Sequence, residues 1–218
     1  LDRMEIKAQR NNDLNLSTVK PYMRNAYVAV ADSFRHQLQL GFNQASLTKV
    51  DVYNLDRFQA NSSEYSTFTA DSLPQWKSKR PWGKHFFATK GNMVEVDKPG
   101  FYLSLNPAIN FQRSIESDFN DPVFVHAYGV NGRGLIGKKV GFQFLATNHA
   151  EQGPLQFRRF VATNNAIPGF GFFDSSSNLK SFRYFDFRGS VSTHITKYIN
   201  VQFGHDQQFI GNGYRSLL

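Results

Sequence analysis

The stretch FYLSLNPAINFQ, residues Phe101–Gln112, decides the fold, because its apolar and polar residues alternate with a period of two. Successive side chains of a β-strand point to opposite faces, so this period indicates a strand. One face is apolar and the other is polar. The two sets are Phe101, Leu103, Leu105, Pro107, Ile109 and Phe111 against Tyr102, Ser104, Asn106, Asn110 and Gln112.

Two further hairpins repeat this pattern around short turns at Gly137–Lys139 and Thr196–Tyr198. Long polar connections, at about 113–122 and 149–181, alternate with the short turns. The sequence therefore predicts an all-β fold, an antiparallel up-and-down array of hairpins. Six strands are expected, at about 92–96, 100–112, 123–136, 140–148, 182–195 and 199–210.

The length of the alternating stretches distinguishes two classes of β protein. Strands of soluble proteins are typically about five or six residues long, whereas a tilted strand that crosses a bilayer needs about 9 to 11. The stretches here are of the second kind, and short turns opposite long loops are typical of outer-membrane barrels. We therefore expect part of a transmembrane β-barrel in the cell outer membrane. A soluble β-sandwich, which buries its apolar face, stays open as the alternative.

Six strands are fewer than the roughly eight of the smallest membrane barrels. Residues 92–218 are accordingly expected to form the first six strands of an incomplete barrel, the N-terminal part of a longer protein. Residues 1–91 are polar and weakly periodic, and are expected to form an irregular, partly helical leader or plug-like region. Within it we expect a short helix at Met23–Phe34, a strand at Phe34–Leu40 and a loop at Asn61–Asp71. Aromatic residues expected at a membrane interface are Trp76, Trp82 and Tyr198.

Composition excludes several classes of protein. The chain of 218 residues has no cysteine, hence no disulfide framework or thiolate metal site. No apolar run approaches the 18 residues of a transmembrane helix. The formal charge of +8 is spread along the chain, with no basic run longer than two, so no nucleic-acid partner is expected.

The sequence motifs that resemble enzyme sites are better explained by structure than by catalysis. Gly132–Gly137 matches the dinucleotide fingerprint G-x-G-x-x-G, but the segment after it alternates as a strand, whereas the fingerprint requires a helix. The six histidines are far apart, and no metal site or cofactor is expected. The carboxylates Glu116, Asp118 and Asp121 are more simply explained by a solvated loop than by an acid and base pair. No catalytic residue is predicted.

Cations and aromatic rings suggest contacts with sugars. Asp186 and Arg188 lie two residues apart on the polar face of one expected strand, where they would form an ion pair in the barrel lumen. Aromatic faces stack on sugar rings and arginine binds carboxylates, so an external loop that contacts glycan is expected near Phe157–Phe160 and Ile167–Phe173, with ordinary loop packing as the alternative. The cations expected to contact an acidic glycan are Arg133, Arg158, Arg159 and Arg188.

Several short blocks, spread over most of the chain, resemble a known family of large outer-membrane barrels, the Wzi-type capsule assembly proteins and their relatives associated with gliding motility. The blocks are Leu1–Lys7, Lys84–Lys90, Phe101–Pro107, Ile167–Gly171, Ile199–Asp206 and Phe209–Leu218. None is a catalytic motif.

The resemblance implies a non-enzymatic outer-membrane barrel that assembles or attaches surface polysaccharide, or supports gliding-type surface machinery. It implies as partners outer-membrane lipid, acidic surface polysaccharide, and other outer-membrane or secretion components. A porin for small solutes and a soluble β-sandwich lectin or glycosidase are the alternative functions.

Overall fold

A computed structural model describes residues 3, 6–7, 24–42, 47–79, 86–117, 119–170, 173, 181–196 and 199–206, and the side chains of all of these except 119 and 120. The chain divides into two compact units, with the boundary between Asp97 and Lys98. The elements are α2 (Arg24–Gln39), α3 (Lys49–Ala60), the 3₁₀ turn η1 (Pro74–Trp76), β1 (Val94–Lys98), β2 (Phe101–Glu116), β3 (Phe119–Ile136), β4 (Val140–Gln152), α4 (Leu155–Asn164), β5 (Phe182–His194) and β6 (Asn200–His205).

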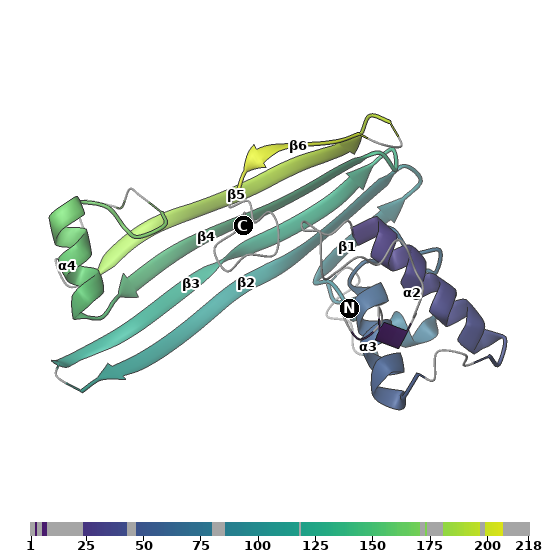
Figure 1. Ribbon diagram of the computed structural model, residues 1–218, viewed down its shortest axis with the longest axis horizontal. Coiled ribbons are helices and arrows are strands. Elements are labelled where there is room, and N and C mark those ends of the chain that lie inside the picture. The colour runs from purple at the N-terminus through teal and green to yellow at the C-terminus, as the bar shows by residue number, and fades with distance from the viewer. Residues whose placement is uncertain are drawn as a thin grey trace. The chain divides into compact units, whose positions relative to one another are not determined.

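The six strands form one sheet in the order β1-β2-β3-β4-β5-β6, so each strand pairs with its neighbours in sequence (Figure 1). The pairings from β2 to β6 are all antiparallel. The predicted six-stranded up-and-down sheet is therefore confirmed. Among the described residues the sheet is open, with β1 and β6 as its edge strands.

Strands β2 and β3 are longer than the alternation predicted. They pair from Phe101 opposite Ile136 to Glu116 opposite Phe119, with a register shift after Ser114. The long loop expected at about 113–122 is thus wrong, because most of these polar residues continue the two strands and only residues 117 and 118 connect them. The connection expected from 149 onward is also shorter, since β4 continues to Gln152 and α4 follows.

In the N-terminal unit, α2 and α3 pack through an apolar cluster. Tyr27, Val30, Ala31 and Phe34 of α2 are buried against Leu55 of α3. The helix expected at Met23–Phe34 is confirmed and extends to Gln39, so the strand expected at Phe34–Leu40 is wrong. Phe34 and the partly buried Leu38 lie four residues apart and therefore share one face of the helix. Over so short a stretch, apolar residues at these positions fit a helix as well as a strand.

A buried carboxylate joins the helices of this unit to the Ser/Thr-rich segment that follows α3. Asp32 accepts hydrogen bonds from the side-chain amide of Gln59 (2.7 Å) and the hydroxyl of Ser66 (2.8 Å). It also accepts from the backbone amide and the hydroxyl of Thr67 (2.6 and 2.8 Å). The segment predicted as a loop at Asn61–Asp71 forms turns, and Asp32 supplies the partner for their donors. A buried charge with several hydrogen bonds stabilises one arrangement of the chain.

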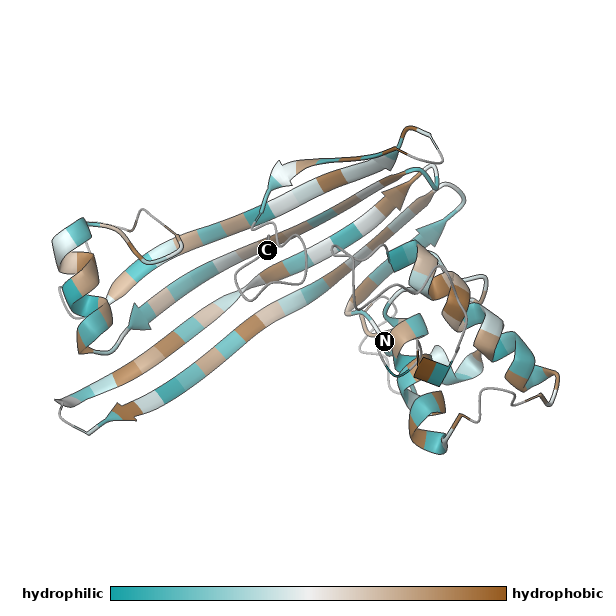
Figure 2. Cartoon of the chain, viewed as in Figure 1, coloured by the Kyte–Doolittle hydropathy of each residue, from teal (hydrophilic) through white to brown (hydrophobic). Residues whose placement is uncertain are grey.

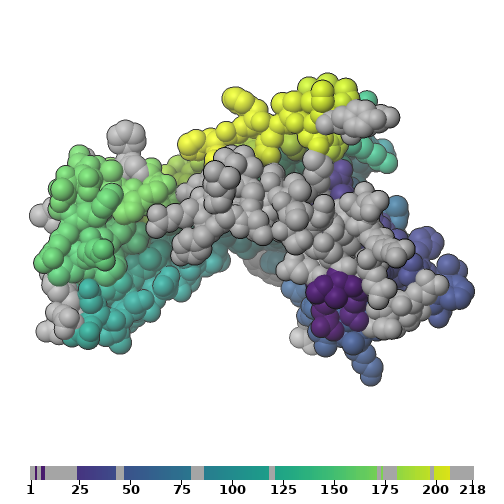
Figure 3. Space-filling view, in the orientation of Figure 1, coloured from purple at the N-terminus to yellow at the C-terminus, as the bar shows by residue number. Residues whose placement is uncertain are grey.

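Helix α4 lies at the end of the sheet opposite the turns that join β3 to β4 and β5 to β6 (Figure 1). Val161 and Ile167 are buried against Phe182 and Tyr184 of β5. The space-filling view shows the side chains of α4 packed against the strand atoms at this end (Figure 3). The β2–β3 hairpin also holds α4, because Glu116 accepts a hydrogen bond from the Leu155 amide (3.2 Å) near the start of the helix.

Candidate functional site

The strand register gives the sheet two chemically different faces. Directly opposed residues of an antiparallel ladder lie on the same face. The row that contains Pro107, Val130, Ala146 and Phe187 is apolar, whereas a row on the other face contains Ser104, Arg133, Gln143 and Ser190. Figure 2 shows this as alternating brown and teal along the strands.

The apolar face is exposed. Its large side chains remain uncovered by the described part of the chain, with Ile109 63% exposed, Phe111 71%, Phe185 66% and Phe203 85%. Isolated exposed apolar residues are ordinary, whereas a contiguous apolar surface marks an interaction with a membrane or another molecule. We name the apolar-face side chains between the rows of Phe101 and Phe111 the apolar belt.

Charged residues bound the apolar belt at both ends. At the α4 end, the next position on β2 after Phe111 on this face is Arg113, and Arg183 precedes Phe185 on β5. At the other end the β3–β4 turn contains Lys138 and Lys139. The sheet therefore presents an apolar surface of limited height between two charged margins.

Two glycines of the motif Gly132–Gly137 allow close packing on the apolar face. A Cβ atom at Gly132 would lie 2.5 Å from the ring of Phe144, and one at Gly134 would lie 2.2 Å from the ring of Phe142. The rings thus cover the backbone of the neighbouring strand. Because β4 follows the motif, the expectation that a strand and not a helix follows these glycines is confirmed.

The polar face carries an ion pair and a group of stacked rings near α4. Arg188 Nε lies 2.9 Å from Asp186 Oδ2, so the predicted pairing of these residues is confirmed. The Arg188 guanidinium also lies over the ring of Phe170, 5.4 Å from its centroid. We name the following residues the polar-face cluster: Thr147, His149, Glu151, Phe170, Tyr184, Asp186 and Arg188.

Aromatic stacking orders the remaining residues of the polar-face cluster. The rings of His149 and Tyr184 stack with centroids 4.6 Å apart and planes 7° apart, and Phe170 contacts both rings. Tyr184 donates a hydrogen bond to Glu151 (2.8 Å). The sequence interpretation named neither His149 nor Tyr184 as a site residue, although Tyr184 lies on the polar side of the strand predicted at about 182–195 and His149 directly follows the strand predicted at about 140–148.

The arginines expected to contact glycan have different surroundings. Arg133 is half-buried on the polar face, one row from Arg188 across the sheet. Arg158 of α4 is engaged within the fold, since it donates to Gly153 O (2.8 Å) and to Asp121 Oδ2 (3.1 Å). Arg159 is exposed on α4. The structure therefore associates Arg133 and Arg188 with one face, and gives Arg158 a structural contact.

The carboxylates of the β2–β3 hairpin also have structural partners. Asp121 pairs with Arg158 and Glu116 accepts from Leu155, while Asp118 lies outside the described residues. The described residues contain no group of three His, Asp or Glu side chains able to hold a metal ion.

Of the three aromatic residues expected at a membrane interface, the structure describes Trp76. Trp76 is 2% exposed and packs with Phe68 and Leu73, and its indole donates to Asp56 Oδ1 (2.9 Å). A buried indole cannot anchor the chain at a lipid surface, which corrects the expectation for this residue. Trp82 and Tyr198 lie outside the described residues. No helix among those described is both long and apolar enough to span a bilayer.

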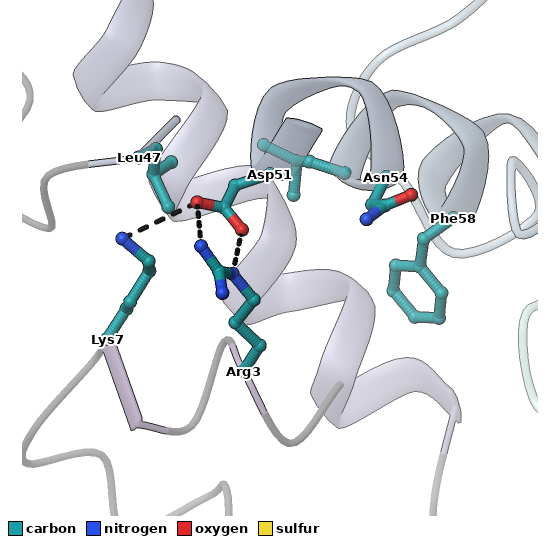
Figure 4. Close-up of a pocket in the computed structure, with 7 residues that line it drawn as sticks. Arg3, Lys7, Leu47, Asp51, Asn54 and Phe58 are labelled. Carbon is teal, nitrogen blue, oxygen red and sulfur yellow. Dashed lines mark hydrogen bonds and ion pairs between the residues drawn. The ribbon is translucent and has the colours of Figure 1, made fainter. Parts of the chain in front are cut away.

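A small pocket lies at the start of α3 (Figure 4). Its apolar wall includes Leu47 and Phe58, and Asp51 lies at its polar side between Arg3 and Lys7. The hydrogen bond from Arg3 and those from the amide and hydroxyl of Thr48 hold the pKa of Asp51 well below its usual range. Because these donors already engage the carboxylate, the pocket is best explained as the seam that joins Arg3 and Lys7 to α3.

Comparisons of the sequence with protein-family models and with curated proteins, and of the fold with solved structures, give no significant match.

Proposed function

We propose that the sheet is part of the wall of a non-enzymatic outer-membrane β-barrel, with the apolar belt toward lipid and the polar face toward the lumen. The observation that carries this proposal is the exposure of many large apolar side chains along one face of the sheet. Burying each such side chain in an apolar environment contributes about 1.5–3 kcal/mol. A lipid bilayer supplies that environment over the entire face.

The dimensions of the apolar belt match a bilayer. On β2 the belt covers the eleven residues from Phe101 to Phe111. The ten steps of about 3.4 Å between Phe101 and Phe111 span ~34 Å along the strand, or ~26 Å when the strand is tilted by about 40°, against an apolar band of about 25 Å in outer-membrane barrels. The charged margins then fall where the polar head groups lie. Closing such a wall requires strands in addition to the six described, because the smallest membrane barrels have about eight.

The polar face supports the second half of the proposal, a contact with acidic surface polysaccharide during its assembly or attachment. Arg133 and Arg188 place two guanidinium groups on the lumenal face, and a guanidinium forms paired hydrogen bonds with a carboxylate. The ring of Phe170 lies beside Arg188 and contacts the ring of Tyr184, and aromatic faces are suited to sugar rings. A role in gliding-type surface machinery would use the same wall.

A fractionation experiment tests the membrane half of this proposal. The protein that contains this sheet, isolated from the cells that produce it, should remain in the membrane pellet after a high-salt wash and should require detergent for extraction. Recovery of a folded monomer in buffer without detergent would contradict the proposal, since the apolar belt would then be stable in water.

Binding to immobilised acidic polysaccharide tests the glycan half. Arg133→Ala with Arg188→Ala should weaken binding, whereas Arg159→Ala, on the exposed surface of α4, should not. Equal binding by all three proteins would refute the assignment of the lumenal arginines.

A further inference from the structure

Besides the polar-face cluster, the sheet has a polar feature on its apolar face, at the margin of the apolar belt nearest α4. Arg113 is directly opposite Phe124 in the β2–β3 ladder, and Phe111 is directly opposite His126. The two pairs are consecutive on the apolar face. The margin therefore combines a guanidinium with a group of rings.

The rings pack against one another. The centroids of Phe124 and His126 are 4.8 Å apart, and those of Phe111 and His126 are 5.4 Å apart with the planes nearly perpendicular. Phe111 and His126 are both exposed. Exposed aromatic side chains at one margin of an apolar face are typical of the depth at which lipid head groups meet the acyl chains.

A second cation lies along the same margin. Arg183 is opposite Ala150, which is itself opposite His126, so Arg183 shares the row of Phe111 and His126. Both arginines are exposed. With strands about 4.8 Å apart, Arg113 and Arg183 are separated by roughly 15 Å, so they would reach two different anions.

We infer that this margin binds the phosphate groups of lipids whose head groups carry a net negative charge, in the leaflet at the α4 end of the sheet. Arginine presents a planar set of donors that matches phosphate, and each arginine near an anionic membrane surface favours binding. An acidic glycan in the lumen would meet the other face, which makes lipid the occupant that the position of these residues fits. This inference rests on the proposed orientation of the apolar belt toward lipid.

Binding to two kinds of vesicle tests the inference. The probes are vesicles of phosphatidylcholine alone and vesicles that also contain lipid A, a phosphorylated glucosamine lipid. The unmodified chain should prefer the second kind, by about fivefold for each arginine and about 30-fold for both. The double substitution Arg113→Ala with Arg183→Ala should abolish the preference, whereas Lys49→Ala with Arg57→Ala removes the same net charge from α3 and should preserve it.

The outcomes separate this inference from the proposed function. Insertion into both kinds of vesicle with equal affinity would refute the lipid-phosphate site and leave the membrane wall intact. Failure to insert into either would contradict the membrane wall itself. Loss of the preference in the α3 control would also refute the site, because net charge alone would then explain it. Preference retained by Arg113→Lys with Arg183→Lys would support a cationic contact and show that the margin tolerates substitution.

Discussion

Replacing Val191 with arginine measures the environment of the apolar belt, because a neighbouring residue provides a matched control. Val191 lies opposite Phe142 on β4 and Phe203 on β6, and is 48% exposed. Ser192, the next residue, is exposed on the polar face. The two positions thus share a strand and a depth, and differ in the face on which they lie.

The expected magnitudes differ between the two positions. An arginine on the lipid face destabilises a barrel by about 2–4 kcal/mol at the bilayer midplane and by about 0–1 kcal/mol near the interfaces. Val191 shares the row of Leu103, one row inside the margin of the apolar belt, so Val191→Arg should cost about 1–2 kcal/mol. The folding equilibrium constant should therefore fall about 5- to 30-fold, by the conversion of about 1.4 kcal/mol for each factor of ten. Ser192→Arg places the same charge toward a polar surface, where substitutions usually change stability by about 0.5 kcal/mol or less.

Urea titration of the chain folded into phosphatidylcholine vesicles is the assay, with circular dichroism of the strands and protease resistance of the sheet as two readouts. Coincident transitions by both readouts justify a two-state free energy. Equal destabilisation by Val191→Arg and Ser192→Arg would refute the assignment of the two faces, because it would place both side chains in the same kind of environment.

Two further predictions concern packing and pH. Gly132→Ala should destabilise the sheet by about 1–3 kcal/mol, since the new Cβ overlaps the ring of Phe144, and adding Phe144→Leu should recover part of the loss in the same urea titration. Asp51 has a folded pKa below its unfolded value of about 3.9, so its contribution to the stability of the N-terminal unit is complete above that pH and is lost as the pH falls through the folded pKa. In Asp51→Asn the melting temperature should fall less steeply as the pH is lowered. An unchanged pH dependence of the melting temperature would refute the role of this carboxylate.

The sheet could be predicted from the sequence because its signal is local. Alternation from Phe101 to Gln112 identifies both the strand and the residues on each face, and the register bears this out. The ends of the strands could not be predicted in the same way. Beyond Gln112 the polar residues Glu116 and Asp121 look like a loop, and only their contacts with α4, some 35 to 40 residues later, give them ordered partners.

Helix α3 could have been found from its first turn. Thr48 and Asp51 form a reciprocal capping box, in which the Thr48 hydroxyl accepts from the Asp51 amide (3.3 Å) and Asp51 accepts from the Thr48 amide (2.9 Å). This spacing is visible in the sequence. By contrast, nothing local indicated that Trp76 would be buried, because its position depends on Asp56 and on the fold of the whole N-terminal unit.

The polar-face cluster likewise contains one contact that the sequence predicts and one that it does not. The pairing of Asp186 with Arg188 follows from their spacing on one strand, and was predictable. The stacking of His149 on Tyr184 depends on the register between β4 and β5, which places these two residues directly opposite one another. Register is a property of the paired strands and is set by contacts that no single stretch of sequence contains.

Single-cysteine scanning of β5 tests the orientation of the sheet most directly, because the chain has no cysteine of its own. Each position from 184 to 193 is replaced in turn, labelled with a nitroxide in vesicles, and exposed to oxygen and to a water-soluble relaxation agent. The proposal predicts a period of two, with odd-numbered positions such as Phe187 accessible to oxygen from the lipid and even-numbered positions such as Ser190 accessible from water. Equal access of the water-soluble agent to both sets of positions would contradict it.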